Sequence, residues 1–361
     1  MKKTTTLMLA ASMTLSLVGC SAGGSEEKHV VNVCSWGEYI DTDLITQFEE
    51  ESGIKVNYQT VDSNEALDSL LRAGSANFDV IVPSDYLISQ MIEEDRLQPI
   101  NYENIPNFSL IDERFQNQPY DPENQFTVPY TWGTLGMIYN TTLIEDEITS
   151  WDAMFDTAYA GQVLMINNSR DAIGIALLAL GYSVNTTSET ELNEAKDLIA
   201  EAKTNGVYQS FVMDQVFSKM EGGEAALATY YAGDYLVMVD NNPDLAYVVP
   251  ETGSNWFIDA MCILKDAENV SEAEEWINFI CSTEASLANM DYIWYASPNT
   301  EALAGYPAYY EELYEEPLDM ELYEIMAPSY DIEAAHEAYL VMPSNIRTLY
   351  SDLWTEIGVA G

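Results

Sequence analysis

The sequence predicts an α/β protein in which the sheets are mostly parallel. Three observations support this fold class. Strand-like and helix-like segments alternate from residue 30 onward, and a second alternating region begins near residue 139. In addition, hydrophobic residues make up 47% and aromatic residues 11% of the 361 residues, enough to form a sizeable core. Strands that alternate with helices form βαβ units with parallel strands, and the length suggests about two domains.

The first region has the order strand, helix, strand, helix, strand. Its predicted elements are a strand at 30–34, a helix at 41–52, a strand at 54–58, a helix at 64–73 and a strand at 79–82. Ile54, Val56 and Tyr58 alternate with polar residues, which is the two-residue period of a strand. Gly53 is expected to end the first helix, and Pro83 is expected to end the last strand.

The second region continues the alternation. Its predicted elements are a strand at 163–166, a helix at 173–180, a helix between Ser188 and Gly206, a short helix at 224–228 and a helix after Ser271. Ser188 and Ser271 each stand three residues before a glutamate, which is the spacing of a capping box. The helix after Ser188 has an apolar stripe made of Leu192, Ala195, Ile199 and Ala202.

Residues 1–19 have the pattern of a signal peptide. Lys2 and Lys3 give a basic start, and the mostly apolar run at 7–18 is too short for a comfortable membrane span. The run ends in Leu-Val-Gly-Cys, which resembles the lipobox of bacterial lipoproteins and implies cleavage before Cys20 and lipidation of its thiol. A lipidated cysteine would hold the protein on the extracytoplasmic face of the membrane, with residues 20–28 as a flexible tether. An ordinary cleaved signal with an incidental cysteine is the alternative.

The charge balance excludes several classes of partner. The chain has 13 Lys and Arg against 60 Asp and Glu, which gives a formal net charge of −47. Cleavage after residue 19 would remove two lysines and no acid, and so change −47 to −49. Nucleic acids and anionic membrane surfaces attract basic proteins, so neither is an expected partner. A small, soluble or cationic ligand fits this charge better.

Cysteine content and motif content argue against a metal site and against common enzymes. Three cysteines follow the lipobox, Cys34, Cys262 and Cys281, and an odd number cannot all pair within the chain. Cys34 and Cys262 lie in apolar runs, which favours buried thiols over a disulfide. The spacings match no zinc pattern, and the sequence has no GxSxG, HExxH, Walker A or Rossmann motif. We expect no metal, no cofactor and no catalytic residue, although paired carboxylates leave glycoside hydrolysis open.

Candidate binding residues follow the predicted strands, because ligands of open α/β sheets bind beyond the carboxyl ends of strands. These segments are 35–39, 83–86, 167–171, 230–231, 255–259 and 292–295. They combine aromatic rings with carboxylates, and Arg170 is their one basic residue. Aromatic faces attract ammonium groups by roughly 0.5–2 kcal/mol, and carboxylates fix ammonium groups by charge-assisted hydrogen bonds. The combination suits a small polycation with an apolar spine.

Asp259 is the most informative of these acids. It lies in the otherwise apolar run 256–264, where a period of two places it on the same face as Phe257. A carboxylate in a buried strand is unfavourable unless it is paired. A cation in a cleft and an internal partner such as Arg170 are both suitable, and the residues alone leave the two open. Trp36 is equally consistent with the core and with a binding site.

These segments resemble the spermidine/putrescine-binding lipoproteins of ABC importers. The resemblance rests on CSWGEYID, FEEESGIKVNYQTVDSNEAL, FDVIVPSDYLI, FTVPYTWGTLGMIYN and YIWYASPNT, which are spread across residues 30–305. It implies a two-lobe, periplasmic-binding-protein-like fold of type II, in which each lobe is a mostly parallel sheet flanked by helices and the ligand cleft lies between the lobes. One lobe would contain residues 29–136 plus 259–305, and the other residues 137–258 plus 306–361.

The strand ends and the resemblance together give one set of candidate ligand-binding residues. They are Trp36, Gly37, Glu38, Tyr39, Ser84, Asp85, Tyr86, Asn168, Asp171, Tyr231, Phe257, Asp259 and Tyr295. The resemblance implies that Asp171 grips a terminal amine and that Asp259 lies near the middle of the ligand.

Four of these positions depart from the pattern of some family members. Gly37 stands in place of Thr, Asn168 in place of Asp, and Tyr231 and Phe257 in place of Trp. The changes leave the polyamine class intact and bear on the length of the ligand and on affinity.

The resemblance implies an extracytoplasmic lipoprotein that captures spermidine or putrescine and delivers it to the permease of an ABC importer. The expected partners are the polyamine, the permease subunits and, through Cys20, the membrane. Two alternatives stand beside this hypothesis. One is a receptor for another cationic or small polar solute, and the other is a hydrolase that uses two carboxylates.

Overall fold

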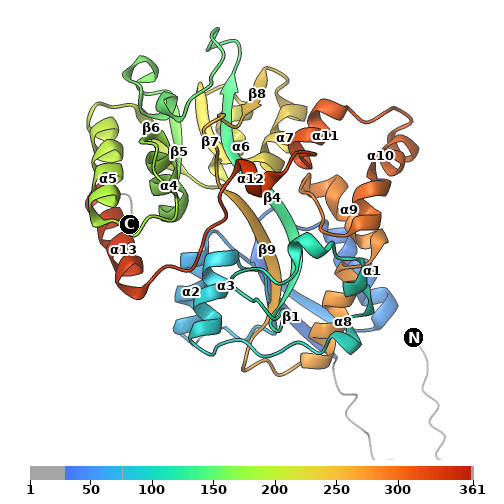
Figure 1. The fold of residues 1–361 in the computed structure, drawn as a ribbon. Helices are drawn as coiled ribbons and strands as arrows, with labels where there is room; N and C mark the ends of the chain where they lie inside the picture. The colour runs from blue at the N-terminus through green and yellow to red at the C-terminus, as the bar shows by residue number, and fades with distance from the viewer. Residues whose placement is uncertain (1–28, 75, 359–361) are drawn as a thin grey trace, which may run out of the picture.

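The computed structural model describes residues 29–74 and 76–358 (Figure 1). The predicted signal peptide, Cys20 and most of the tether lie outside these residues. Within the described ranges, no helix is both long enough and apolar enough to cross a bilayer.

The described strands form one sheet in the order β2-β1-β3-β9-β4-β7-β5-β6, with β8 paired to β4 beside this path. The strands are β1 (Val30–Trp36), β2 (Lys55–Val61), β3 (Val80–Ile81), β4 (Thr127–Asn140), β5 (Val163–Ile166), β6 (Tyr208–Val212), β7 (Leu227–Tyr231), β8 (Leu245–Val248) and β9 (Trp256–Ile263).

The sheet has two parallel halves that are joined by antiparallel strands. On one side β1 pairs in parallel with β2 and β3, and on the other side β5 pairs in parallel with β6 and β7. The long strand β4 connects the two sides, because residues 127–134 pair with β9 and residues 135–140 pair with β7 and β8. Strand β9 is antiparallel to both β3 and β4. The predicted parallel pairs are therefore present, and the antiparallel pairs involve β4 and β9.

Helices surround both halves of the sheet (Figure 1). They are α1 (Thr42–Ser52), α2 (Asn64–Arg72), α3 (Asp85–Glu93), α4 (Ser169–Ala179), α5 (Glu189–Thr204), α6 (Gln215–Glu221), α7 (Ala232–Asn241), α8 (Val270–Ile280), α9 (Thr283–Ile293), α10 (Thr300–Tyr314), α11 (Met320–Met326), α12 (Ile332–Ala335) and α13 (Ser344–Ile357). Helices α1, α2 and α8 pack beside β1 and β2, whereas α4, α6 and α7 pack beside β5, β7 and β4.

The C-terminal segment crosses the face of the molecule. Helix α11 packs against α7, and α13 packs against α5 and α4 (Figure 1). Between α12 and α13 the chain passes the start of β9, where Glu337 forms a bridge with Asn255. This route brings the segment at 338–341 close to the ends of the central strands.

Several helix ends have the local signals that the sequence predicts. Helix α1 begins after Asp41, whose side chain accepts a hydrogen bond from the backbone N–H of Asp43, and it ends at Gly53 with φ 75°. Helix α5 begins after Ser188, whose hydroxyl accepts from the backbone N–H of Glu191. The predicted stripe of α5 is buried against its neighbours.

One predicted element is wrong, and two predicted helices are present but begin differently from the prediction. Residues 227–231 form strand β7 and not the end of a helix, because this short apolar run is fully buried between β4 and β5. Helix α4 begins at Ser169 and not at 173, since the Asn168 side chain caps it. Helix α8 begins after Asn269 without a side-chain cap, so the expected capping box at Ser271 does not form.

The three described cysteines are buried free thiols, which the sequence predicts for Cys34 and Cys262. Cys34 on β1 and Cys262 on β9 each pair with Ile81 of β3, which lies between them. Two strand spacings separate their backbones by about 10 Å, and a disulfide requires Cα atoms within about 7 Å. The sheet therefore keeps these two thiols apart.

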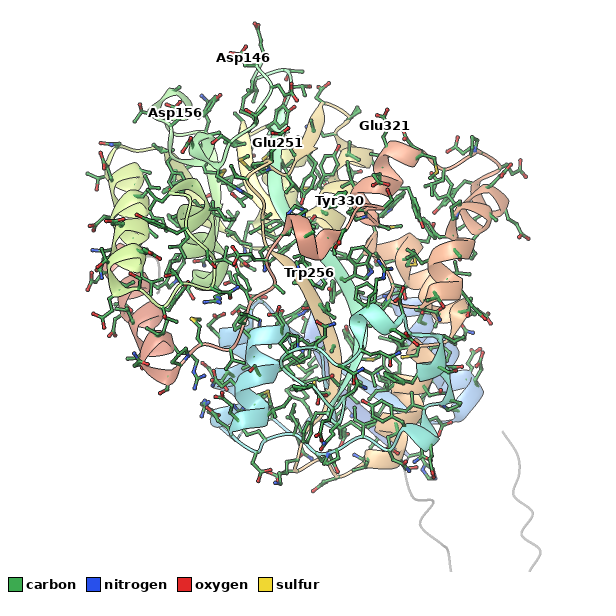
Figure 2. The ribbon with its side chains drawn as sticks, viewed as in Figure 1. Asp146, Asp156, Glu251, Trp256, Glu321 and Tyr330 are labelled. Atoms are coloured by element: carbon green, nitrogen blue, oxygen red, sulfur yellow. The ribbon has the colours of Figure 1, made fainter. Side chains whose placement is uncertain are left out.

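Acidic side chains cover the outside of the fold (Figure 2). Asp146, Asp156, Glu251 and Glu321 are examples, and all four are exposed. Since few of the described acids are buried, the net charge mainly describes the solvated surface. The acids that face the centre of the molecule form a separate group.

Candidate ligand-binding site

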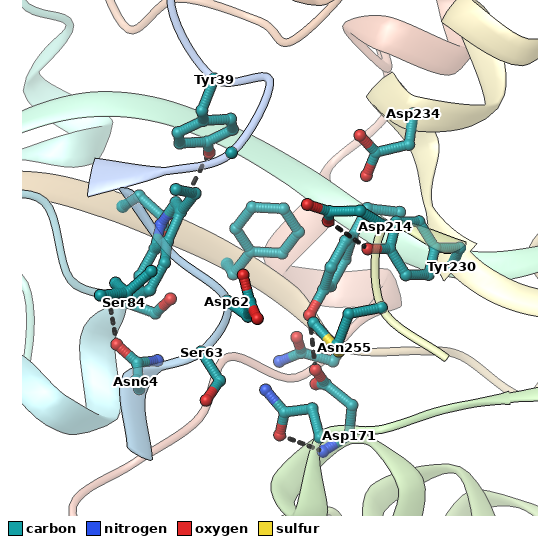
Figure 3. Close-up of a pocket in the computed structure, with 18 of the residues that line it drawn as sticks. Tyr39, Asp62, Ser63, Asn64, Ser84, Asp171, Asp214, Tyr230, Asp234 and Asn255 are labelled. Atoms are coloured by element: carbon teal, nitrogen blue, oxygen red, sulfur yellow. Dashed lines mark hydrogen bonds between the residues drawn. The ribbon is translucent and has the colours of Figure 1, made fainter. Parts of the chain in front are cut away.

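A cleft with about 750 Å³ of free space lies where the ends of the central strands from both halves of the sheet meet (Figure 3). Segments that follow β1, β2 and β3 line one side, and segments that follow β5, β6 and β7 line the other. Strand β9 with the residue before it, Tyr295 after α9, and the C-terminal segment contribute the remainder. This is the position at which α/β folds bind their ligands.

All but one of the thirteen candidate residues line the cleft. Those that do are Trp36, Gly37, Tyr39, Ser84, Asp85, Tyr86, Asn168, Asp171, Tyr231, Phe257, Asp259 and Tyr295. Glu38 does not line the cleft. It is exposed and has a backbone φ of 48°, so the turn after β1 directs its side chain toward solvent.

Asp259 is buried on β9 and is held by two aromatic donors. The Trp36 Nε1–H donates to Asp259 Oδ2 at 3.1 Å, and the Tyr39 hydroxyl donates to the same oxygen at 2.9 Å. The other oxygen, Oδ1, is buried and has no protein partner among the described residues. Burial raises the pKa of Asp259 to about 6, against the side chains of Ser84, Tyr39 and Trp36, which lower it. A donor supplied by a ligand would satisfy Oδ1.

The structure gives Asp259 no internal cation. Arg170, the internal partner that the sequence left open, lies with its guanidinium 4.4 Å from the centroid of the Tyr339 ring and donates to Asn185 Oδ1 at 3.1 Å. Among the described residues it forms no ion pair with Asp259. The sequence left two partners open for this carboxylate, a cation bound in the cleft and an internal basic residue. The geometry favours the cation bound in the cleft.

Asp171 lies in the first turn of α4 and is held by two tyrosines. The Tyr231 hydroxyl donates to Oδ2 at 2.7 Å, and the Tyr339 hydroxyl donates to Oδ1 at 2.9 Å. Asn168 accepts from the backbone N–H groups of Arg170 and Asp171, which fixes the start of the helix. Burial raises the pKa of Asp171, and the hydroxyls and the Arg170 charge oppose this shift. Asp171 is therefore rigidly positioned.

Asp234 and Tyr295 form a third pair. The Tyr295 hydroxyl donates to Asp234 Oδ2 at 2.7 Å. A Cβ atom at Gly233 would lie 2.3 Å from carbons of the Tyr295 ring, so only glycine allows this close approach. Burial, together with the charges of Asp214 and Glu38, raises the pKa of Asp234 to about 7. Glu38 thus acts on the site by its charge.

Two exposed acids face each other from opposite sides of the cleft (Figure 3). Asp62 follows β2 and Asp214 follows β6. Burial, and then the Asp62 charge, raises the pKa of Asp214. A Cβ atom at Gly37 would lie 2.8 Å from Asp214 Oδ2, so a larger residue there would displace this carboxylate.

Aromatic rings form the walls between these acids. Tyr39 and Tyr295 meet edge to face with centroids 5.1 Å apart, and Tyr231 and Phe257 do so at 5.3 Å. Phe257 and Tyr295 are 6.2 Å apart, which connects the two pairs. Such rings cover methylene groups and attract ammonium groups.

Several residues that line the cleft were not among the candidates predicted from the sequence. They are Val61, Asp62, Ser63, Asn64, Met213, Asp214, Asp234 and Tyr339. Asp62 and Asp214 follow strands, so the strand-end rule would have found them if β6 had been recognised and β2 had been extended to Val61. Tyr339 gave no signal, because it comes from an irregular segment that crosses the molecule.

A family model described as bacterial extracellular solute-binding protein matches residues 43–314. The chain belongs to this family. A relative from Escherichia coli (strain K12), the spermidine/putrescine-binding periplasmic protein, is 31% identical over 304 residues, which cover 84% of this chain and 86% of the relative. The putrescine-binding periplasmic protein PotF of the same organism is 26% identical over 376 residues, covering 99% of this chain and 98% of that one.

Solved structures confirm the two-lobe fold class of this solute-binding protein. A putative spermidine/putrescine ABC transporter from Listeria monocytogenes is 36% identical and superposes with a TM-score of 0.84, covering 91% of this chain and 99% of that one. The spermidine/putrescine ABC transporter substrate-binding protein PotD from Streptococcus pneumoniae is 32% identical, with a TM-score of 0.74 over 91% of this chain and 98% of that one.

The side chains that line the cleft of the solute-binding protein favour a positively charged ligand. Six aspartates line the cleft, Asp62, Asp85, Asp171, Asp214, Asp234 and Asp259, and no Lys or Arg is among the described lining residues. No group of three or more acids, histidines or cysteines in the described part of the chain has the arrangement of a metal site. The cleft is built for an organic cation with apolar segments.

Proposed function

We propose that this protein captures polyamines, spermidine or putrescine or both, in the cleft and delivers them to the permease of an ABC importer. A polyamine is a chain of methylene groups with protonated amines, which matches a cleft lined by aromatic rings and carboxylates. Of the two relatives from Escherichia coli, one is named for binding spermidine and putrescine and the other for binding putrescine, which supports the same ligand class here.

One observation carries the proposal. Asp259 Oδ1 is buried in the cleft without a hydrogen-bond partner among the described residues, although Trp36 and Tyr39 hold the other oxygen in place. An unpaired buried carboxylate oxygen is unfavourable. An ammonium donor would remove this penalty and would find the aromatic rings beside it.

Capture and release are proposed to follow from movement of two lobes. Strand β4 changes its partner from β9 to β7 between Thr134 and Leu135, which supports a crossing between the proposed lobes 29–136 plus 259–305 and 137–258 plus 306–361. A ligand that contacts both sides binds the closed form more tightly and shifts the population toward closure. The closed form would then dock on the permease, and no covalent chemistry is required.

The proposed location is the extracytoplasmic face of the cell membrane, with Cys20 as the lipid anchor. The test is to express the full chain and its Cys20→Ala variant in bacteria and to separate membrane from soluble fractions. We expect the unaltered chain in the membrane fraction and the variant in the soluble fraction. A variant that stays with the membrane would contradict the anchor and leave the ligand proposal intact.

Titration calorimetry tests the ligand. The probes are putrescine, spermidine, an amino acid and a sugar, each added to the protein without its first 28 residues. We expect saturable heat with at least one polyamine and none with the sugar. Heat only with the amino acid or the sugar would favour a receptor for another solute, and glycoside hydrolysis that is lost in Asp171→Asn would favour a hydrolase.

A further inference from the structure

A small recess with about 320 Å³ of free space adjoins the cleft at the Asp171 end. Asp85 and Tyr339 line both the cleft and the recess, so these two side chains form the boundary between them. Tyr339 is also a donor to Asp171. The recess therefore begins directly beyond the carboxylate that is expected to grip a terminal amine.

The recess contains two buried polar side chains that lack suitable partners. Asp85 is 3% exposed, and among the described residues only the backbone N–H of Tyr86 donates to its carboxylate, at 2.6 Å. Tyr120 is 9% exposed, and its buried hydroxyl has no partner in the described structure. Both line the same recess, and the Asp85 charge acts on Tyr120. A carboxylate and a hydroxyl that face one space can both accept from a single donor.

No basic side chain of the described residues lies in ion-pair contact with Asp85, although the Arg170 charge acts on it from a longer distance. Arg170 itself is engaged with Asn185 and the face of Tyr339. Burial raises the pKa of Asp85, and the charges of Asp259 and Asp171 raise it further, whereas the Tyr86 N–H and the charge of Arg170 lower it. Three carboxylates that repel one another around one end of the cleft need more positive charge than a single amine brings.

The other walls of the recess are suited to a hydrocarbon chain. Pro119 and Ile258 form part of the lining, together with Ala338 and Val341 of the C-terminal segment. The polar atoms of Asp85 and Tyr120 are thus set among apolar groups, as in sites that recognise one charged end of a flexible ligand.

From this arrangement we infer that the recess receives an additional protonated amine of a polyamine longer than a diamine. It binds the end of a triamine that extends past Asp171, and it makes the protein select spermidine over putrescine. This inference rests on the proposed polyamine function and adds the length of the ligand to it. The amine donates to the Asp85 carboxylate and to the Tyr120 hydroxyl oxygen.

The decisive experiment compares two ligands on three variants by calorimetry. Asp85→Asn keeps the shape of the side chain and removes its charge, so we expect spermidine to bind about tenfold or more weakly while putrescine changes by less than about threefold. Tyr120→Phe should weaken spermidine by about threefold and leave putrescine unchanged. Asp352→Asn on the exposed face of α13 removes the same charge away from the cleft and should change neither ligand.

Each other outcome has a definite meaning. An equal loss for both ligands in Asp85→Asn, or no loss for either, overturns the recess as an amine site, and so does unaltered protein that prefers putrescine. Absence of heat with both polyamines on the unaltered protein overturns the proposed function instead. Thermal unfolding of each variant checks that it folds, and Tyr120→Phe gives an independent test if Asp85→Asn does not.

Discussion

Two pairs of aspartates in the same cleft differ in almost every physical respect except charge. Asp171 and Asp259 are each 4% exposed and each accepts two hydrogen bonds from aromatic side chains. Asp62 and Asp214 are exposed, and the Tyr230 hydroxyl, the one side-chain donor to Asp214 in the described part of the chain, is 3.4 Å away. We call these the buried pair and the exposed pair. A carboxylate that is fixed by hydrogen-bond donors and shielded from water interacts more strongly with a bound cation than an exposed one does. The buried pair should therefore contribute more to the binding free energy than the exposed pair.

The largest difference is expected between Asp259→Ala and Asp62→Ala. Removal of the buried carboxylate should cost about 2–5 kcal/mol of polyamine binding, because an ammonium group is then left in the cleft without its partner. The matched change at the exposed position should cost less than about 1 kcal/mol. Calorimetry with spermidine and putrescine measures both. A loss of less than tenfold at Asp259 would contradict its central role.

Binding should also weaken as the pH falls from about 7.5 to about 5.5. In the ligand-free protein burial raises the pKa of Asp234 to about 7 and that of Asp259 to about 6. A cation binds the ionised carboxylates, so below these pKa values a proton must first leave, and affinity falls by up to about tenfold per pH unit for each such group. Calorimetry in buffers with different ionisation enthalpies should show protons released on binding at pH 6. Affinity that is flat over this range would be contrary evidence.

A subtler test removes one hydroxyl from each pair. Tyr231→Phe deletes the 2.7 Å donor to Asp171, whereas Tyr230→Phe deletes the 3.4 Å donor to Asp214. The first change should weaken polyamine binding by about 1 kcal/mol, since Asp171 loses a donor that orients and ionises it. The second should be within about twofold of the unaltered protein. Equal effects would mean that orientation of the carboxylate by tyrosine does not matter.

The smallest effect is expected for Asp62→Asn combined with Asp214→Asn. Exposed charges attract a cationic ligand over a distance that salt shortens. The double variant should bind polyamine less than about tenfold more weakly at low salt and the same as the unaltered protein at high salt. Stopped-flow measurement of the association rate, with Trp36 fluorescence as the signal, checks both. A salt dependence that is unchanged would remove the exposed pair from ligand attraction.

Much of the fold and most of the lining residues were predictable from the sequence, for identifiable reasons. Asp259 could be found because a carboxylate in an apolar strand stands out, and Trp36 and Asp171 because they follow strands. Strand β7 was misassigned, since a short buried apolar run has no period that separates strand from helix. Asp85 was found by its position after a strand, but the recess that it lines together with Tyr120 depends on tertiary packing.

Residues from distant segments could not be predicted in the same way. Tyr339 reaches Asp171 only because the chain after α12 crosses the start of β9. Glu38 shows the opposite limit. Its place after β1 predicts a cleft residue, yet a left-handed backbone at that position directs the side chain to solvent. Because of this positive φ angle, Glu38 does not line the cleft, whereas its neighbours Trp36 and Tyr39 do.

The reaction of the buried thiols with an alkylating reagent would report how often the core of the protein opens. Burial raises the pKa of Cys34 to about 11 and that of Cys281 to about 12, so almost none of either is in the reactive thiolate form at neutral pH. Cys34 lies in the first strand and Cys281 follows α8. Alkylation would therefore proceed only when the core opens, and its rate would measure that event. A bound ligand should slow the labelling by a factor of one plus the ratio of the free ligand concentration to Kd, because it lowers the population of the open state by that factor.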